Sequence, residues 1–232
     1  MVPDPSAPHE FGFVALVLLV AAAIVILVRR ATGPANRVAI GLAIYLAAYY
    51  ALGASGLIDD AAPPKPLFVL GPALAAALWF ALRSRAGEAL VSHTPIAALV
   101  GLHAFRLPLE LLMHEWSREG ALPVQMTFAG LNWDIVTGIT AVLVAPFAAR
   151  SRALVLVWNI VGLLLLANIV TIAITSIPGP MRLFMNDPPN LLVMRAPYIW
   201  LPTFLVQVAL AGHILVFRAL RRSRAPAIAV TR

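Results

Sequence analysis

The stretch LHAFRLPLELLMHE, residues 102–115, places four ionisable side chains ahead of its final glutamate, inside an otherwise apolar segment of membrane-spanning length. They belong to His103, Arg106, Glu110 and His114. At about 100° per residue, the four fall within an arc of roughly 80° on one helix face. An ionisable side chain within a bilayer is costly unless it faces protein or water. The stretch therefore predicts a buried polar site inside a bundle of membrane helices.

The composition supports the same class of fold. The 232 residues are 61% hydrophobic and 12% charged, with a mean hydropathy of +0.90, whereas a soluble domain carries about 25% charged residues. We therefore predict an all-α, polytopic transmembrane bundle forming one domain over residues 1–232, with the lipid bilayer as its partner. The absence of cysteine excludes disulfides and thiolate ligands. The net charge of +7 does not indicate nucleic acid, because the arginines flank apolar runs.

Seven apolar stretches have about the length needed to span the hydrocarbon core. They lie near 11–29, 38–57, 67–83, 95–117, 128–149, 152–177 and 196–220. The first three, within 11–83, carry little polarity, whereas the last four, within 95–220, hold nearly every candidate site residue. The third is the shortest and contains Gly71 and Pro72, so the sequence does not decide whether it crosses the whole membrane. Pro108 is expected to kink the fourth.

The distribution of arginines predicts the orientation. Alternate loops hold nearly all of them: Arg29, Arg30 and Arg37, then Arg83 and Arg85, then Arg150 and Arg152, then Arg218, Arg221, Arg222 and Arg224. The positive-inside rule then places the N-terminus outside and the C-terminus in the cytoplasm. The first span is expected to be a retained anchor, because its positive charges follow the apolar run. The seventeen basic residues include one lysine, Lys65, which favours a GC-rich bacterial genome and a bacterial inner membrane.

Counting 1.5 Å per residue from the middle of each span predicts one polar layer. Its members are the candidate ligand or charge-setting residues Arg106, Glu110, Asp134, Asn168, Thr203 and Gln207. A second, inner layer would contain His103, Asn159 and His213. Asn159 lies about 180° from Asn168, and His213 about 120° from Gln207. We therefore expect Asn159 and His213 to point away from the polar layer.

The charges of the layer suggest a function. Arg106 supplies one positive charge against Glu110 and Asp134, and an uncompensated buried carboxylate binds a proton or attracts a cation. We expect the two carboxylates to approach within about 8 Å around an outward-facing cavity. The predicted function is the binding or conduction of a small cationic or protonated ligand. In a purely structural alternative, Arg106 and Glu110 form a static pair on one helix.

An enzymatic alternative remains open. Glu110 and His114 have the i, i+4 spacing that allows both to reach one divalent metal ion, with Asp134 or Asp187 as a third ligand. Copper is a further option, because methionines gather at the predicted outer side near His114: Met113, Met126, Met181, Met185 and Met194. Such an enzyme would act on a lipid or small molecule at the outer leaflet. The sequence indicates no catalytic residue, and it leaves the cofactor and the oligomeric state open.

The segment 178–195, PGPMRLFMNDPPNLLVMR, is the one long connection. Its prolines prevent a long helix, and its leucines and methionines are too apolar for a solvated loop. We expect it to lie on the outer mouth as a lid, with Asn186 and Asp187 turned toward the polar layer or capping a short helix.

Two stretches carry a resemblance. QMTFAGLNWDIVTGITA at 125–141, and MNDPPN followed by YIWLPTFLV within 185–206, resemble segments of uncharacterised bacterial multi-pass integral membrane proteins. The resemblance covers the second half of the chain, implies a membrane protein and brings no activity with it.

Overall fold

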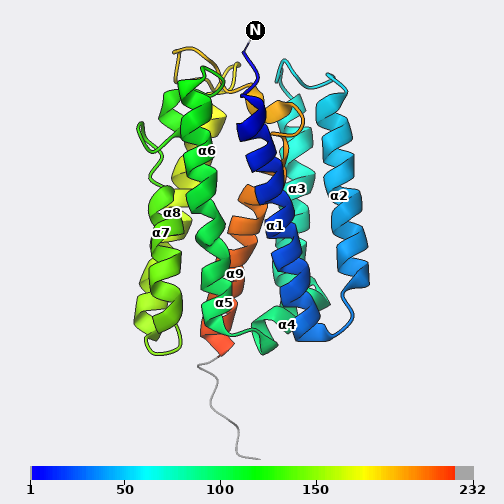
Figure 1. Ribbon diagram of the computed structural model, residues 1–232, viewed down its shortest axis with the longest axis vertical. Helices are drawn as coiled ribbons and strands as arrows, with labels where there is room; N and C mark the ends of the chain where they lie inside the picture. Colours follow the sequence, from blue (N-terminus) through cyan, green and yellow to red (C-terminus); the bar gives the residue numbers. More distant parts are fainter. Residues whose placement is uncertain (1, 223–232) are drawn as a thin grey trace, which may run out of the picture.

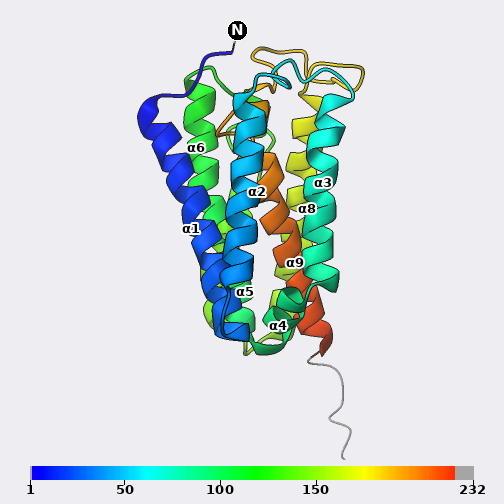
Figure 2. The ribbon, with the colours of Figure 1, turned by 90° about the vertical axis from the view of Figure 1, so that its right-hand side faces the viewer.

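The computed structural model describes residues 2–222, and within this range the chain is all-α. Long helices run side by side in an upright bundle (Figure 1). We call one end of the bundle the N-terminal end, because it carries the start of the chain, and it also carries the longer connections (Figures 1 and 2). We call the opposite end of the bundle the C-terminal end, because the last helix finishes there.

Six helical stretches are long and apolar enough to cross a membrane, which is typical of an integral membrane protein. They are α1 (Ala7–Thr32), α2 (Asn36–Ala54), α3 (Lys65–Arg83), the composite α5–η1–α6 (Ile96–Arg118), α8 (Arg152–Thr175) and the composite η5–α9 (Leu201–Arg222). A seventh, shorter apolar stretch consists of α7 (Ile135–Val144) and the turn η3 (Ala145–Phe147). The third predicted span is therefore a full helix despite the internal Pro72.

The fourth span is broken one turn before its proline. It consists of α5 (Ile96–Gly101), the 3₁₀ turn η1 (Leu102–Phe105) and α6 (Arg106–Arg118). Pro108 cannot donate to the carbonyl of residue 104, and its ring crowds that carbonyl. The tightened turn therefore falls where the regular hydrogen bond is missing, and α6 begins at Arg106.

The fifth predicted span, 128–149, is wrong at its beginning, because helix α7 starts only at Ile135. Residues 119–134 form a non-helical connection that includes the short turn η2 (Val124–Met126). Several of its residues are buried, among them Gln125, Thr127 and Asn132. Irregular backbone at membrane depth is tolerated where protein surrounds it. The connection therefore brings polar side chains inside the bundle.

The C-terminal end also holds a helix that hydrophobicity alone did not reveal. Helix α4 (Arg85–His93) is capped by Ser84, whose Oγ accepts from the amide of Gly87 at 2.9 Å. Glu88 accepts hydrogen bonds from Arg218 and from Arg222. These contacts tie α4 to α9 (Val206–Arg222). Arg224 lies outside the described residues.

The N-terminal end is closed by aromatic packing and polar contacts. Phe13 packs edge-on against Trp116, with ring centroids 5.2 Å apart, and both rings contact Tyr198. Glu119 accepts from the amide of Ser6 at 3.1 Å and lies 2.9 Å from Nδ1 of His9. The start of α1 is thereby fastened to the end of α6.

The segment 178–195 lies on the N-terminal end, and only its second half is packed. Leu192, Val193 and Met194, in the turn η4 (Leu192–Met194), are buried, whereas Leu183 and Met185 are exposed. Asn186 donates to Oε1 of Gln125 at 2.8 Å. The expectation for Asp187 is wrong, because this side chain is exposed and has no hydrogen bond or ion pair within residues 2–222.

Gly53 provides a test of the packing between α2 and the last connection. A Cβ at this position would lie 2.7 Å from the amide nitrogen of Ala196. We expect Gly53→Ala to lower the free energy of unfolding by about 1–3 kcal/mol, because backbone must move. The matched control is Gly41→Ala on the same helix, where no heavy atom lies within 4 Å of the added Cβ. Denaturant unfolding in detergent measures both, and equal destabilisation would contradict the close approach.

Glu119 provides a pH-dependent test of the contact between the chain ends. Desolvation acts to raise the pKa of Glu119, but the hydrogen bonds from Ser6 and His9 outweigh it and hold the pKa below its ordinary value of 4.5. Stabilisation by the carboxylate is therefore complete above pH 4.5 and is lost as the pH falls through the lowered value. Unfolding midpoints of the wild type and Glu119→Gln should converge below pH 4.5. Profiles that stay parallel down to pH 3 would refute this interpretation.

Candidate functional site: a buried polar chain

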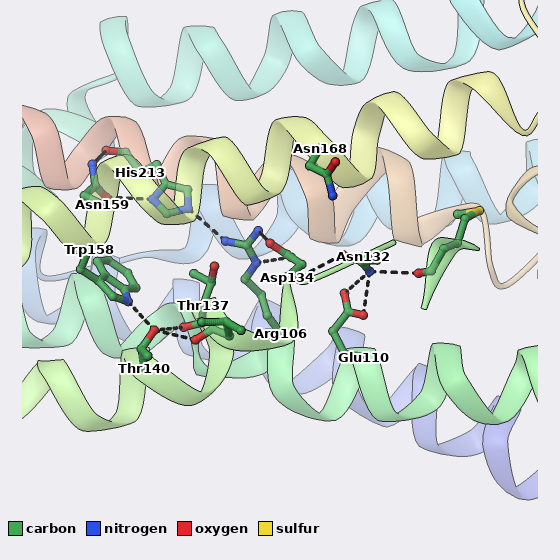
Figure 3. A network of polar contacts seen from close by, with 12 residues as sticks. Arg106, Glu110, Asn132, Asp134, Thr137, Thr140, Trp158, Asn159, Asn168 and His213 are labelled. Atoms are coloured by element: carbon green, nitrogen blue, oxygen red, sulfur yellow. Dashed lines mark hydrogen bonds and ion pairs between the residues drawn. The ribbon is translucent and has the colours of Figure 1, made fainter. Parts of the chain in front are cut away.

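Arg106 is the centre of the buried polar contacts. Its side chain is 1% exposed, and its Nε and Nη2 donate to the two carboxylate oxygens of Asp134. Its Nη1 donates to Nε2 of His213 at 3.0 Å. One guanidinium group thus connects α6, the residue before α7, and α9 (Figure 3). A bidentate arginine–carboxylate pair is the geometry that gives the strongest charge-assisted hydrogen bonds.

His213 continues the contacts toward the C-terminal end. Its Nδ1 lies 2.8 Å from Oδ1 of Asn159, and Asn159 Nδ2 donates to the carbonyl of His213 at 3.1 Å. Arginine can only donate, so Nε2 of His213 accepts and Nδ1 carries the proton. His213 is therefore neutral in this arrangement.

Glu110 and Asn132 continue the contacts toward the N-terminal end. The amide nitrogen of Asn132 donates to Glu110 Oε1 at 2.8 Å, to Oε2 at 2.7 Å and to the carbonyl of Met126 at 2.9 Å. The side-chain oxygen of Asn132 accepts from the backbone amide of Asp134 at 3.0 Å. Asn132 therefore links the carboxylate of Glu110 to the backbone of Asp134. We call Glu110, Asn132, Asp134, Arg106, His213 and Asn159, in this spatial order, the polar chain (Figure 3).

His103 lies beside the polar chain and is not hydrogen-bonded to it. Its ring centroid is 4.2 Å from that of His213 and 5.3 Å from that of Trp158. Neither ring nitrogen of His103 has a partner within residues 2–222. Glycines allow this close packing, because a Cβ at Gly212 would lie 2.6 Å from His103 Nε2, and one at Gly162 would lie 2.7 Å from His213 Cε1.

Of the six residues predicted for the polar layer, three come together and three do not. Arg106, Glu110 and Asp134 are buried and line one cavity. The other three use their side chains for backbone carbonyls: Asn168 donates to Leu131 at 2.9 Å, Thr203 to Ile199 at 2.6 Å, and Gln207 to Pro202 at 3.0 Å. Asn168 is exposed on the bundle surface.

The π-helical turn η5 (Leu201–Leu205) explains the contact that Gln207 makes. A π turn leaves carbonyls without their regular partners, and these need other donors in an apolar bundle. Gln207 satisfies Pro202, and the hydroxyl of Tyr45 donates to the carbonyl of Thr203 at 2.6 Å. Gln207 also lines a second cavity, which α2 borders.

The expectation that Asn159 and His213 point away from the site is wrong. Both are fully buried and belong to the polar chain. Their angular offsets from Asn168 and Gln207 correctly indicated different helix faces. The inward face, however, is the one that carries Asn159 and His213, because the glycines at 162 and 212 allow helices and imidazole rings to approach there.

The candidate metal ligands do not converge. His114 stacks on Phe128, with ring centroids 4.5 Å apart, and Asp187 is exposed on the 178–195 segment. Glu110 and Asp134 lie on the polar chain instead. Within residues 2–222, no group of three or more histidine, cysteine, aspartate or glutamate side chains is placed to hold a metal ion.

The cavity at the site is small. Arg106, Glu110 and Asp134 line it together with apolar side chains such as Leu109 and Leu205, and its volume is about 20 Å³. That is room for about one water molecule. The cavity predicted beside Glu110 and Asp134 is therefore present, and it has the size of about one water molecule.

Asn132 is the site residue that the sequence argument missed. It lies two residues before Asp134, and an asparagine at this spacing before a helix commonly accepts a hydrogen bond from the backbone two residues on. This local signal was present in the sequence. Its contact with Glu110 was not, because that contact joins residues 22 positions apart across the bundle.

The fold and site together define an α-helical bundle of membrane-spanning length whose interior holds a buried arginine-centred polar chain. The chain belongs to a family described as a domain of unknown function (DUF8737), whose model matches residues 64–221. This range contains every member of the polar chain. No curated protein and no solved structure shows a significant match to the chain.

Asp134→Asn tests whether the central ion pair holds the bundle together. The substitution leaves the buried Arg106 charge without its counter-ion, so we expect a loss of about 3–5 kcal/mol in the free energy of unfolding. The matched control is Glu115→Gln, which breaks an exposed pair with Arg118 and should cost about 1 kcal/mol or less. Unfolding in detergent, followed by tryptophan fluorescence, measures both. Similar small effects would show that the pair contributes little.

Proposed function

We propose that this protein is a multi-pass membrane protein that binds a small cationic ligand at Glu110, and that this ligand is a proton. The observation that carries the proposal is that Glu110 is buried and forms no ion pair with any residue in the part of the chain that the structure describes. Glu110 is 1% exposed, and its hydrogen-bond donor within residues 2–222 is the neutral amide of Asn132.

The charges of the polar chain leave one carboxylate uncompensated. Arg106 contributes one positive charge, and Asp134 engages it with both carboxylate oxygens. His213 accepts a hydrogen bond from Arg106 and is neutral. With both carboxylates ionised, the site would carry a net charge of −1 in an apolar interior. Burying an unpaired charge is costly enough that the group is neutralised instead.

The size of the cavity favours a proton over a larger cation. A volume of about 20 Å³ admits one water molecule or a proton carried by it. An organic cation would require the surrounding helices to separate. A metal ion would need further ligands, and the candidates His114 and Asp187 point elsewhere. A metal-dependent enzyme therefore has less support than a proton-binding site.

The structural alternative, a static ion pair that orients helices, applies to a different pair from the Arg106–Glu110 pair expected from the sequence. Arg106 pairs with Asp134 across the bundle rather than with Glu110 on its own helix. Such a pair orients helices without chemistry. In this proposal, the Arg106–Asp134 pair is structural and Glu110 is the proton-binding group.

We further propose seven spans, with the stretch Ile135–Phe147 as the short one, in a bacterial inner membrane. The helix ends collect arginines at the C-terminal end of the bundle: Arg29, Arg30, Arg37, Arg83, Arg85, Arg150, Arg152, Arg218, Arg221 and Arg222. The positive-inside rule then assigns this end to the cytoplasm and the N-terminus to the outside. Glu110 lies one helical turn from Arg106 toward the outer end.

Infrared spectroscopy of the purified protein tests proton binding. We expect a protonated-carboxyl band at neutral pH that is absent from Glu110→Gln and present in the control Glu115→Gln, since Glu115 is paired at the surface. Glu110→Gln should fold with little change in stability, because it is shaped like the protonated acid. A wild type without the band, or one holding stoichiometric metal that Glu110→Gln loses, would refute the proposal.

Proteoliposomes with a trapped pH indicator test whether the bound proton crosses the membrane. Under an imposed membrane potential, proton conduction through Glu110 would change the pH of the lumen. We expect this pH change to be about tenfold faster with the wild type than with Glu110→Gln. Equal rates, together with the infrared band, would show that Glu110 binds a proton without conducting it.

A further inference from the structure

A large cavity lies away from the polar chain, between α2, α3 and α9. Its volume is about 780 Å³, which is within the range of about 300–1,000 Å³ typical of ligand pockets. Its walls are mainly apolar, with Leu42 and Val38 from α2, Ala76 and Phe80 from α3, and Phe204 and Leu215 from the last span. An interior of this kind suits a hydrocarbon chain.

The position of α2 leaves this cavity accessible from the side. Helix α2 is the least buried of the six long helices. It packs on α1 and makes little contact with α3. Trp79 of α3 lines the cavity and is 63% exposed, so the cavity reaches the surface beside α3. In Figure 2, α9 lies behind α2 and α3. In a membrane, this side of the bundle faces lipid, so a hydrocarbon chain can enter the cavity laterally.

Three arginines line the same cavity where it reaches the C-terminal end. They are Arg37 near the start of α2, Arg83 at the end of α3, and Arg85 at the start of α4. All three side chains are exposed, and none forms an ion pair or hydrogen bond within residues 2–222. Glu88, the acidic residue nearest in sequence, is engaged by Arg218 and Arg222. The cavity therefore combines an apolar interior with an unneutralised basic mouth.

We propose that this cavity binds an anionic glycerophospholipid from the leaflet at the C-terminal end of the bundle. One acyl chain would occupy the space between α2, α3 and α9, and the phosphate would contact Arg37, Arg83 and Arg85. A guanidinium group can bind a phosphate with two parallel hydrogen bonds. Basic pockets between membrane helices bind anionic headgroups. A soluble anion would leave the apolar walls exposed, and an apolar ligand would leave the arginines unused.

Native mass spectrometry of the detergent-purified full-length protein tests the headgroup contact. The probes are dioleoyl phosphatidylglycerol and dioleoyl phosphatidylcholine at equal concentration. We expect one tightly retained phosphatidylglycerol, bound about tenfold more weakly by the triple variant Arg37→Gln/Arg83→Gln/Arg85→Gln. The matched control is Arg29→Gln/Arg30→Gln/Arg150→Gln, which removes three positive charges at the same end but does not alter the cavity lining.

A second pair of variants tests the acyl-chain contact without changing charge. Ala76 lines the cavity and Ala75 does not, although both are exposed and adjacent on α3. Ala76→Phe should reduce phosphatidylglycerol retention at least fivefold, and Ala75→Phe should leave it unchanged.

Four outcomes would overturn the proposal. They are equal losses in both triple variants, equal binding of phosphatidylcholine, displacement of the lipid by inorganic phosphate, or a dimer that Ala76→Phe abolishes. The first would indicate surface charge alone, and the last a second copy of the chain. Glu110→Gln should retain lipid normally, which distinguishes failure here from failure of the proton-binding proposal.

Discussion

The guanidinium group of Arg106 is the constraint around which the bundle is organised. A buried arginine has five N–H donors and no acceptor, and an apolar interior offers few partners to satisfy them. Two parts of the chain supply acceptors to Arg106: the non-helical connection that ends at Asp134, and α9 with His213. The departures from regular helix at Leu102–Phe105 and at 119–134 lie directly beside it.

The way in which Arg106 is satisfied also defines the candidate site. Because its Nε and Nη2 engage Asp134 and its Nη1 engages His213, Glu110 is left with a neutral amide donor although it lies on the same helix. Breaking a buried charged pair with good geometry is costly, whereas an unpaired buried carboxylate is stabilised by binding a small cation. Structural and chemical roles thus fall on neighbouring residues of one polar chain.

The bundle separates two kinds of interior. The helices from α5 onward enclose the polar chain tightly, with Gly162 and Gly212 permitting contact between helices and imidazole rings. The first three spans and the last span border a large apolar cavity with an arginine-lined mouth. The cavity beside Glu110 holds about 20 Å³ and the apolar one about 780 Å³, and the two proposals, a proton at the first and an acyl chain in the second, follow this difference in size.

Composition and periodicity alone determined the helical class, the positions of most spans, the gathering of arginines at one end, and the burial of Arg106, Glu110 and Asp134. These properties are local or summed along the chain, so they can be read without knowing the partners. Only the tertiary structure decided which carboxylate Arg106 engages and which helix faces point inward. Helical periodicity gives angles between residues of one helix, but packing against the other helices sets its rotation. For that reason Asn159 and His213 belong to the site, while Asn168 and Gln207 satisfy backbone carbonyls elsewhere.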